Sequence, residues 1–333
     1  MCGICGFTGN GDQSTLEAMM EAMVYRGPDA AGSWSNEHGV YLGHRRLSII
    51  DIADGHQPML TEDASLVLVF NGEIYNHREL RRDLESDGVV FRTDHSDTEV
   101  LLHGYRKWGR SVVDRLNGMW AFALLDRNRG ELWLSRDRFG KKPLYYAQRH
   151  GEFYFSSELA SLCHHPAIDH EIDTTSLVSY FAHGYVPAPG SMVSGVQKLP
   201  AGHNLIYNLT DHSTGLERYW RFEFAPQMDW VNRPQALSEA LIEKLYAAVS
   251  TRMQADVPVG VFLSGGIDSS SVASLAMTAS KSQNVKTYSI GFEDESFDET
   301  AYSSDMAAVL GTDHTNEQLT AAGCLELLDD LYT

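Results

Sequence analysis

Short apolar runs that end at turn residues dominate the first two thirds of the chain. The segment 65–72, SLVLVFNG, is a strand-length apolar run that closes on an Asn-Gly pair. Two more apolar runs in 121–137 flank a polar turn that contains Gly130, and this arrangement predicts a β-hairpin. The segment 153–158, FYFSSE, predicts a further strand. We therefore expect the first part of the chain to be rich in β-sheet.

Two segments between these strands carry helical periodicity instead. In 76–88, leucines recur four residues apart and a glycine closes the segment. The segment 96–109 also ends at a glycine, and Ser96 and Glu99 have the spacing of a capping box. Strands interleaved with helices predict an α+β fold in which helices cover sheets.

After residue 233 the pattern changes to strands and helices in alternation. A helical segment, 236–253, has apolar residues at steps of four. It is followed by a buried strand at 257–263, a small-residue helix, a second apolar strand at 286–292 and a helix at 301–311. This order predicts a βαβ arrangement with a parallel sheet. Because only two strands are evident, we expect either a truncated second domain or a sheet edge that something else covers.

The change of pattern sets the expected domain boundaries. Residues 1–210 form the first domain, and residues 234–333 form the N-terminal part of the second. Residues 211–233 lose both patterns and are predicted to be a connection, in which WRFEF (220–224) is a candidate last strand.

Composition and charge exclude several classes of protein. Hydrophobic residues make up 43% of the 333 residues, which is ordinary for a globular protein. The formal net charge of −19 argues against nucleic acid or an anionic membrane as the main partner. The N-terminus lacks a secretory signal, and no apolar run approaches the roughly 20 residues that a membrane span needs. The four cysteines form no regular framework, so we expect a reducing, cytoplasmic compartment.

The loop SGGIDSS (264–270) lies between the predicted strand and helix and carries the first candidate chemistry. Its two glycines permit close approach of a ligand to the backbone, and the following helix directs free N–H groups at the loop. Such a loop binds phosphate, although it is not a Walker loop because no lysine follows the glycines. A plain glycine turn is the alternative.

The same run resembles the pyrophosphate-binding motif S-G-G-x-D-S of the ATP-pyrophosphatases, which cleave ATP to AMP and pyrophosphate. The resemblance implies that this loop holds the pyrophosphate end of ATP together with Mg²⁺. Asp268 is the one candidate metal ligand, and no other residue is assigned to a metal. Leu263 and Ile290 resemble the positions that contact adenine, with core packing as the alternative. The residues implied for pyrophosphate are Ser264, Gly265, Gly266, Asp268 and Ser269.

The first nine residues, MCGICGFTG, contain a second candidate site. Removal of Met1 would make Cys2 the N-terminal residue. Its own α-amine, with a pKa of about 7.7–8.0, is suited to accept the thiol proton. The alternative is a redox pair of Cys2 and Cys5, but such pairs begin a helix, and the glycines around them are atypical of a helix start. Cys5 is expected to be a small buried side chain.

Four further stretches of the first domain bear on the role of Cys2. They are YRGPDAAG (25–32), GHRRLSIID (43–51), FNGEIYNH (70–77) and HSDTEV (95–100). Together with MCGICG they resemble the class II glutamine amidotransferases of the N-terminal-nucleophile hydrolase superfamily, which implies an αββα sandwich. Combined with SGGIDSS, the set is similar to the glutamine-hydrolysing asparagine synthetase family. RDRFGKKPLYY (136–146) and the segment 184–203 extend this resemblance over nearly the whole chain.

The resemblance implies a role for six residues of the first domain. They are Cys2 as the nucleophile, Asn71 and Gly72 as oxyanion donors, Arg46 for the glutamine carboxylate, and Glu73 and Asp97 for its ammonium. These residue types suit the chemistry, because an arginine fork pairs a carboxylate and preset donors stabilise an oxyanion. The alternatives are ordinary structural roles: an Asn-Gly turn, solvated surface charges and a carboxylate at a helix start.

The implied activity is that of a ligase in which glutamine hydrolysis supplies ammonia to aspartate, activated by ATP as aspartyl-AMP. Its small-molecule partners would be glutamine, ATP and aspartate, with Mg²⁺ for the synthetase half and no cofactor for the glutaminase half; a homodimer is one option. The second acidic motif of complete synthetases is absent, so we expect glutaminase activity only. The alternatives are amidation of another carboxylate, as in polysaccharide tailoring, and a non-catalytic regulatory or dimerisation module.

Overall fold

Two units with separate cores make up the computed structural model, which describes residues 1–226, 233–280 and 285–328. The units are Met1–Glu223 and Phe224–Thr333.

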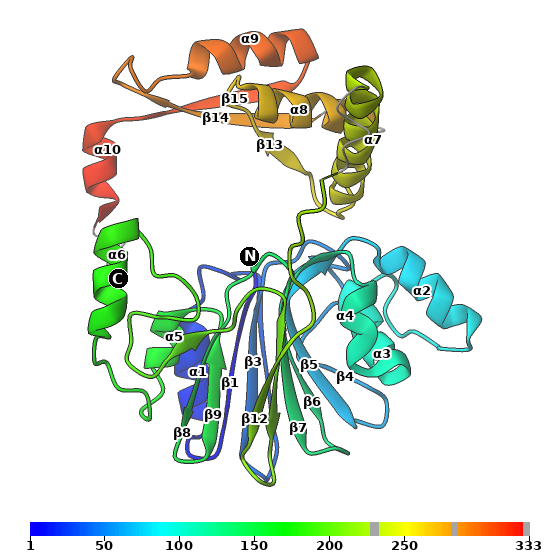
Figure 1. Ribbon diagram of the computed structural model, residues 1–333, viewed down its shortest axis with the longest axis vertical. Helices are drawn as coiled ribbons and strands as arrows, with labels where there is room; N and C mark the ends of the chain where they lie inside the picture. The colour runs from blue at the N-terminus through cyan, green and yellow to red at the C-terminus, as the bar shows by residue number, and fades with distance from the viewer. Residues whose placement is uncertain (227–232, 281–284, 329–333) are drawn as a thin grey trace. The chain divides into compact units, whose positions relative to one another are not determined.

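Two antiparallel sheets, each of six strands, form the frame of the first unit (Figure 1). The first sheet has the order β10-β8-β9-β1-β3-β2 and the second the order β12-β11-β7-β6-β5-β4. The strands of the first sheet are β1 (Gly3–Thr8), β2 (Ala30–Ser35), β3 (Val40–Arg46), β8 (Tyr145–Arg149), β9 (Glu152–Ser156) and β10 (Gln197–Lys198). Those of the second are β4 (Met59–Leu60), β5 (Leu66–Ile74), β6 (Gly118–Asp126), β7 (Glu131–Arg136), β11 (His203–Asn208) and β12 (Thr214–Arg218).

Three apolar layers hold this unit together. Side chains from both sheets, among them Ile4 and Val69, form the layer between the sheets. Alternate residues of the same strands face outward under helices, because successive side chains on a strand point to opposite faces. The outer face of the second sheet packs under α2 (His77–Ser86), α3 (Asp97–Trp108) and α4 (Val112–Arg115). The outer face of the first sheet packs under α1 (Gln13–Glu21) and α5 (Leu159–Cys163). The predicted αββα sandwich is confirmed.

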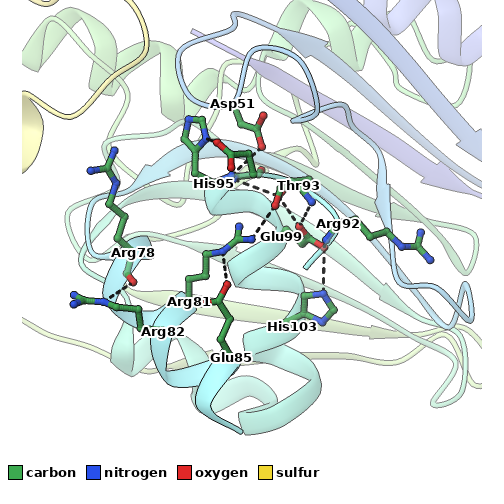
Figure 2. Close-up of polar contacts among 12 residues, drawn as sticks. Asp51, Arg78, Arg81, Arg82, Glu85, Arg92, Thr93, His95, Glu99 and His103 are labelled. Atoms are coloured by element: carbon green, nitrogen blue, oxygen red, sulfur yellow. Dashed lines mark hydrogen bonds and ion pairs between the residues drawn. The ribbon is translucent and has the colours of Figure 1, made fainter. Parts of the chain in front are cut away.

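The local predictions for this unit hold for the elements and fail at one cap. The predicted hairpin at 121–137 is the pair β6–β7, and both predicted helices are present as α2 and α3. The capping box at the start of α3 is absent, because the Ser96 side chain makes no cap hydrogen bond. Glu99 instead accepts hydrogen bonds from the backbone N–H of Arg92 at 2.9 Å and of Thr93 at 2.8 Å (Figure 2). Its carboxylate therefore fixes the segment before the helix.

One strand lies in the segment predicted to be a connection. β12 pairs with β11 along its whole length, whereas WRFEF (220–224) is not a strand. All five residues of β12 are exposed. A strand that buries neither face carries no apolar alternation, which is why the pattern missed it. The segment also includes Trp220, whose N–H donates to the carbonyl of Gly202 at 3.2 Å.

A parallel three-stranded sheet, with the order β13-β14-β15, organises the second unit. The strands are β13 (Gly260–Phe262), β14 (Lys286–Phe292) and β15 (Asp313–Leu319), and the helices are α7 (Pro234–Arg252), α8 (Ile267–Ala279), α9 (Thr300–Leu310) and α10 (Ala321–Glu326). The predicted βαβ arrangement is confirmed. The prediction of a buried strand at 257–263 is wrong in length and burial, because β13 is short and its Gly260 and Phe262 are exposed. β15 was not predicted, because its sequence DHTNEQL is polar and mostly exposed. No residue of α7 is buried in the described structure, so its apolar steps of four do not face a core. Among the described residues, no helix is both long and apolar enough to cross a membrane.

One further helix, α6 (Thr174–His183), completes the first unit. Asp173 caps it by accepting the N–H of Ser176 at 2.7 Å, and Gly184 ends it in the left-handed conformation.

Candidate active site

The thiol of Cys2 lies at the start of β1, against the segment that follows β3. Its Sγ accepts the N–H of Leu47 at 3.4 Å and lies 3.6 Å from the carbonyl oxygen of the same residue. Burial raises the pKa of the Cys2 thiol, and the hydrogen bond from Leu47 opposes this rise. A thiol in this environment would need a base to deprotonate it at neutral pH before it could act as a nucleophile.

Cys5 occupies a different environment from Cys2. It is fully buried in the apolar layer beneath α1, and this burial raises the pKa of its thiol. Residues three apart on a strand face opposite sides of the sheet, and all four cysteines of the chain are free thiols. The interpretation of Cys2 and Cys5 as a redox pair is therefore wrong, and Cys5 is the buried side chain that the sequence predicted.

A single cavity brings together most of the predicted glutaminase residues. Five of the six line it, and they come from the start of β1, the end of β3, the end of β5 and the start of α3: Cys2, Arg46, Gly72, Glu73 and Asp97. The remaining lining residues are Leu47, Ile49, Ile50, Gly55, Gln57, Phe70, Ser96 and Thr98. A larger cavity of about 820 Å³ lies among hairpin turns that include 63–65, 125–130 and 207–212, and it contains none of the predicted residues.

Asn71 lies beside this cavity without lining it. Its side chain is 1% exposed, and its amide nitrogen and oxygen have no hydrogen-bond partner among the described residues. Alternation along β5 puts Asn71 on the same side as Val69, which belongs to the layer between the sheets. A buried amide without partners costs about 1–3 kcal/mol of stability. Such a group is suited to donate to an oxygen that develops charge during a reaction.

The backbone that precedes Gly72 is held by side chains from two other segments. The Phe70 N–H donates to Gln57 Oε1 at 2.6 Å, and the Phe70 carbonyl oxygen lies 3.1 Å from His44 Nε2. Both contacts are on the side of β5 that faces away from β6. Two residues further along the strand, the N–H of Gly72 faces the same side. This orientation makes the Gly72 N–H available as the second donor.

Glu73 and Asp97 form a pair of like charges in the cavity. Burial and repulsion from Asp97 raise the pKa of Glu73, and the nearby Lys142 opposes the rise. Burial also raises the pKa of Asp97, although its carboxylate accepts the N–H of Ile74 at 3.0 Å. Two buried carboxylates in this arrangement are stabilised by a cation placed between or beside them. The pair therefore suits an ammonium group.

Arg46 lines the cavity, but most of its guanidinium is already engaged. Nη1 donates to the carbonyl of Ile52 at 3.0 Å, and Nη2 donates to the carbonyls of Ile50 at 3.2 Å and Asp51 at 2.6 Å. Two of its five N–H groups remain for a substrate. Arg46 thus orders the loop that follows β3 in addition to facing the cavity.

Two further cations flank the terminal residues. The Nε–H of Arg26 donates to the Cys2 carbonyl at 3.0 Å, and Arg26 also pairs with Glu158. Lys142 is 6% exposed, and burial lowers its pKa while Glu73 and Cys2 favour its charged form. Burial lowers the pKa of the Met1 amine, and the charges of Arg26 and Lys142 add to this effect. A terminal amine in this position is therefore more readily neutral and more available as a base.

The loop 264–270 has the geometry of a strand-to-helix turn in the second unit. Gly266 is the N-cap of α8, and Asp268 lies in its first turn. The Ser264 and Ser269 hydroxyls lie 3.0 Å apart, and Ser269 Oγ also donates to the Gly266 carbonyl at 3.2 Å. Gly265 has a φ of +81°, and a Cβ there would lie 2.5 Å from the Tyr302 Cβ. Within the loop, the Ser264 N–H donates to Ser269 Oγ at 3.2 Å and the Gly266 N–H donates to Ser264 Oγ at 3.4 Å. The N-terminus of α8 is therefore the part of this turn that suits an anion.

The two residues predicted to contact adenine lie in different environments. Leu263 is 2% exposed and packs in a core cluster with Ala273 and Ala307. Ile290, on β14, is 54% exposed. Core packing therefore accounts for the Leu263 side chain, while the Ile290 side chain remains accessible.

Several residues of the cavity were not identified from the sequence. Gln57 and Thr98 both line it, and Gln57 Nε2 donates to Thr98 Oγ1 at 3.3 Å. Lys142 lies near Cys2 and Glu73 although it belongs to a different segment. No spacing rule connects these residues, because they meet only when the two sheets stack. Lys142 stands in the charged segment RDRFGKKPLYY (136–146), and only its burial in the structure distinguishes it from its neighbours.

Sequence comparisons match both units to families. A glutamine amidotransferase domain family matches residues 1–220, and an asparagine synthase family matches residues 240–333. Asparagine synthetase [glutamine-hydrolyzing] 1 of Bacillus subtilis is 39% identical over 95% of this chain and 50% of its own length. The putative asparagine synthetase [glutamine-hydrolyzing] 2 of Methanocaldococcus jannaschii is 36% identical over 99% of this chain and 67% of its own length. The chain thus spans about half to two thirds of the length of these relatives.

Solved structures share the fold at low sequence identity. The allosteric regulatory enzyme of purine biosynthesis matches with a TM-score of 0.52 and 15% identity, over 98% of this chain and 91% of that one. Glutamine phosphoribosylpyrophosphate amidotransferase from B. subtilis matches with a TM-score of 0.50 and 17% identity, over 95% of this chain and 65% of that one. The first unit has the N-terminal-nucleophile hydrolase fold that the sequence predicted, and the chain belongs to the glutamine-hydrolysing asparagine synthetase family.

Proposed function

We propose that the first unit hydrolyses glutamine at Cys2 and releases ammonia. The observation that carries this proposal is the convergence of Cys2, Arg46, Gly72, Glu73 and Asp97 on one cavity. Apart from the neighbours Gly72 and Glu73, these residues are distant in the sequence. A purely structural role gives no reason for a thiol, a guanidinium and two carboxylates to meet there.

The proposed chemistry begins once Met1 has been removed. The α-amine of Cys2 takes the thiol proton, and Sγ attacks the side-chain amide carbon of glutamine. The Asn71 amide and the Gly72 N–H donate to the oxyanion as it forms. The carbon–nitrogen bond then breaks, the proton passes to the leaving nitrogen, and ammonia departs from a thioester on Cys2. Water cleaves the thioester, which releases glutamate and restores the thiol.

The cavity supports recognition of the amino-acid end of the substrate. Glu73 and Asp97 would receive the ammonium, which relieves the repulsion that raises the pKa of Glu73. Arg46 would bind the carboxylate with its remaining N–H groups, assisted by the backbone of its loop. Glutamine presents both charges together with a side-chain amide carbonyl that a thiolate can attack.

For the whole protein we propose glutamine-dependent asparagine synthesis, in which ATP activates aspartate as aspartyl-AMP. The family match over 240–333 and the SGGIDSS loop support this part. The loop residues Ser264, Gly265, Gly266, Asp268 and Ser269 would hold the pyrophosphate end of ATP, with Asp268 as the candidate ligand of Mg²⁺. The N-terminus of α8, for which Gly266 is the N-cap residue, fits an anion of this kind. ATP would supply the leaving group that makes the aspartate carboxylate reactive.

The first experiment combines product analysis with intact mass. The protein is incubated with glutamine, and glutamate and ammonia are measured; a parallel sample receives a glutamine-analogue electrophile. We expect equimolar glutamate and ammonia, a mass that lacks Met1 and a single adduct on Cys2. Retention of Met1 with neither product nor adduct would refute the glutaminase proposal. Addition of aspartate, ATP and Mg²⁺ then tests for asparagine, and its formation would refute the expectation that this chain is a glutaminase only.

The proposed partners are small molecules, and the proposed compartment is the cytoplasm. The free state of all four cysteines supports a reducing compartment. A homodimer stays a prediction, which light scattering coupled to size-exclusion chromatography would test.

A further inference from the structure

Asp51 has an unusual backbone for a buried residue in the loop that follows β3. Its side chain is 3% exposed, and its φ is +51°, in the left-handed region that residues other than glycine adopt uncommonly and that asparagine and aspartate adopt more readily than most. A conformation of this kind costs of order 1–3 kcal/mol and persists only where the surrounding contacts impose it. The contacts of Asp51 therefore identify what the conformation achieves.

The backbone carbonyl of Asp51 belongs to the cradle around Arg46. It accepts Nη2 of Arg46 at 2.6 Å and the N–H of Gly55 at 2.9 Å. The turn 51–55 closes tightly on the guanidinium, because a Cβ at Gly55 would lie 2.4 Å from Nη2 of Arg46. The left-handed conformation at Asp51 thus points its carbonyl at the residue proposed to bind the substrate carboxylate.

The carboxylate of Asp51 reaches a second segment of the cavity wall. Oδ2 accepts the N–H of His95 at 3.4 Å, and Oδ1 accepts the N–H of Asp54 at 3.3 Å. Figure 2 shows the Asp51 side chain directed at His95, above the loop that leads into α3. His95 lies two residues before Asp97, which is proposed to receive the substrate ammonium.

The far side of the same segment is fixed independently of Asp51. Glu99 accepts two backbone N–H groups from residues 92–93, and the carbonyl of Thr93 accepts Nη2 of Arg81 at 2.8 Å. The Thr93 hydroxyl accepts the N–H of Ser96 at 3.3 Å. The segment 92–96 is thus a short strap that is held at one side by Glu99 and Arg81 and at the other by Asp51.

We propose that Asp51 is a positioning residue for glutamine, which sets the spacing between Arg46 and Asp97. Its carbonyl holds the Arg46 guanidinium, and its carboxylate holds the strap that precedes Asp97. This inference rests on the proposed glutaminase function. Asp51 does not touch the reacting amide, so it acts on the binding of the charged end of the substrate rather than on the nucleophile.

Three substitutions separate the two contributions of this residue. Asp51→Asn keeps a side chain that accepts hydrogen bonds and tolerates the left-handed backbone. Asp51→Gly keeps the backbone conformation and removes the carboxylate. Asp51→Ala removes the carboxylate and disfavours the conformation as well. Asp54→Ala is the matched control, because Asp54 is an exposed carboxylate in the same loop whose side chain does not line the cavity.

The variants are compared by steady-state glutamine hydrolysis on the full chain. We expect KM for glutamine to rise about tenfold in Asp51→Gly, further in Asp51→Ala, and no more than about threefold in Asp51→Asn. We expect kcat to change less than about threefold in each, and Asp54→Ala to match the wild type. Wild-type KM in both Asp51→Gly and Asp51→Ala would overturn the inference.

A second measurement distinguishes misplacement of the substrate from collapse of the site. The rate at which iodoacetamide alkylates Cys2 is followed by mass spectrometry of the N-terminal peptide, since this reagent lacks the α-amino and α-carboxyl groups of glutamine. We expect equal rates for the wild type and all variants. A parallel fall in alkylation and in glutamine binding would overturn the positioning role in favour of a general structural one. Wild-type protein that hydrolyses no glutamine would instead defeat the proposed function itself.

Discussion

His44 Nε2 lies 3.1 Å from the carbonyl oxygen of Phe70, and this contact joins the two sheets directly beside Asn71. His44 is on β3 of the first sheet and Phe70 on β5 of the second. Burial lowers the pKa of His44 to about 3, so the imidazole is neutral and its Nε2–H donates to the carbonyl. The bond therefore fixes the position of Asn71 and Gly72, the proposed oxyanion donors, relative to the sheet that follows Cys2.

The first prediction concerns this bond and its pH dependence. We expect His44→Ala to destabilise the first unit by about 2–4 kcal/mol, through the lost hydrogen bond and the cavity left in the core. The ordinary pKa of histidine is about 6.5, so the unfolded chain binds a proton that the folded chain does not between that value and about 3. Wild-type stability should therefore fall as pH drops through this range.

Urea unfolding at several pH values checks both parts of this prediction. His44→Gln is the informative control, because glutamine offers an N–H donor and does not titrate. Its stability should decline less steeply than that of the wild type below pH about 6.5. An equally steep decline in both proteins would show that other groups control the acid response.

The second prediction separates the two N-terminal thiols. Cys2→Ala should lose glutamine hydrolysis by at least about a thousandfold, since no other thiol reaches the substrate. Cys5→Ala should keep its activity and lose about 1–2 kcal/mol of stability, because it leaves a small void beneath α1. Glutamate release and thermal melting, measured on the same preparations, check both statements. Activity lost equally in both variants would contradict the assignment of Cys2 alone.

The third prediction follows from the paired carboxylates. The raised pKa values of Glu73 and Asp97 mean that the folded state holds protons that the unfolded state has released. Stability should therefore decrease as pH rises above the ordinary carboxyl value of about 4.3. Glu73→Gln removes one of the two charges, so we expect it to melt about 2–4 °C higher than the wild type at pH 8. At pH 4.5 the two proteins should melt alike.

The same substitution should weaken glutamine binding while it stabilises the fold. Loss of one ammonium-binding carboxylate is expected to raise KM for glutamine by about tenfold or more. Calorimetric melting at the two pH values, combined with kinetics, tests this opposition. A variant that melts below the wild type at pH 8 would show that Glu73 is not held in a repulsive pair.

The fourth prediction concerns the loop of the second unit. Gly265 has a left-handed φ of +81°, and a side chain there would meet the backbone and Cβ of Tyr302. Gly265→Ala should therefore deform the loop and weaken binding of ATP with Mg²⁺ by about tenfold. Gly311→Ala is the control, since Gly311 also has a positive φ but meets nothing within 4 Å. Isothermal titration should show unchanged ATP affinity for that control; equal losses in both would assign the effect to general destabilisation.

The sequence was most informative where a residue's neighbours along the chain decide its structure. The β6–β7 hairpin, the helices α2 and α3 and the strand–loop–helix around Gly265 follow from periodicity and turn residues alone. β12 and β15 were not predicted, because both strands are mostly exposed and lack apolar alternation. Local pattern carries no information on a strand whose only stabilisation is its ladder of hydrogen bonds.

The residues of the candidate site also divide into those that the sequence predicted and those that it did not. Cys2 was predicted from its own chemistry as a potential N-terminal residue, and Gly72 and Glu73 from the resemblance of their motif to the family. Gln57 and Lys142 could not, because their place beside these residues depends on how the sheets stack. The capping box at Ser96 shows the opposite error, in which a valid local pattern is overridden because Glu99 finds backbone partners in the preceding strap.

The separation between the cavity beside Cys2 and the larger cavity among the hairpin turns has an evolutionary consequence. Cys2 precedes the first residue of β1, whereas Thr8, the last residue of that strand, lines the larger cavity among the hairpin turns. A strand of six residues spans about 20 Å. Insertions and deletions in turns such as 36–39 and 127–130 therefore change the length of the chain without disturbing the nucleophile. We expect relatives of this chain to differ in length mainly at that end, and it is the natural place to attach a label or a second domain.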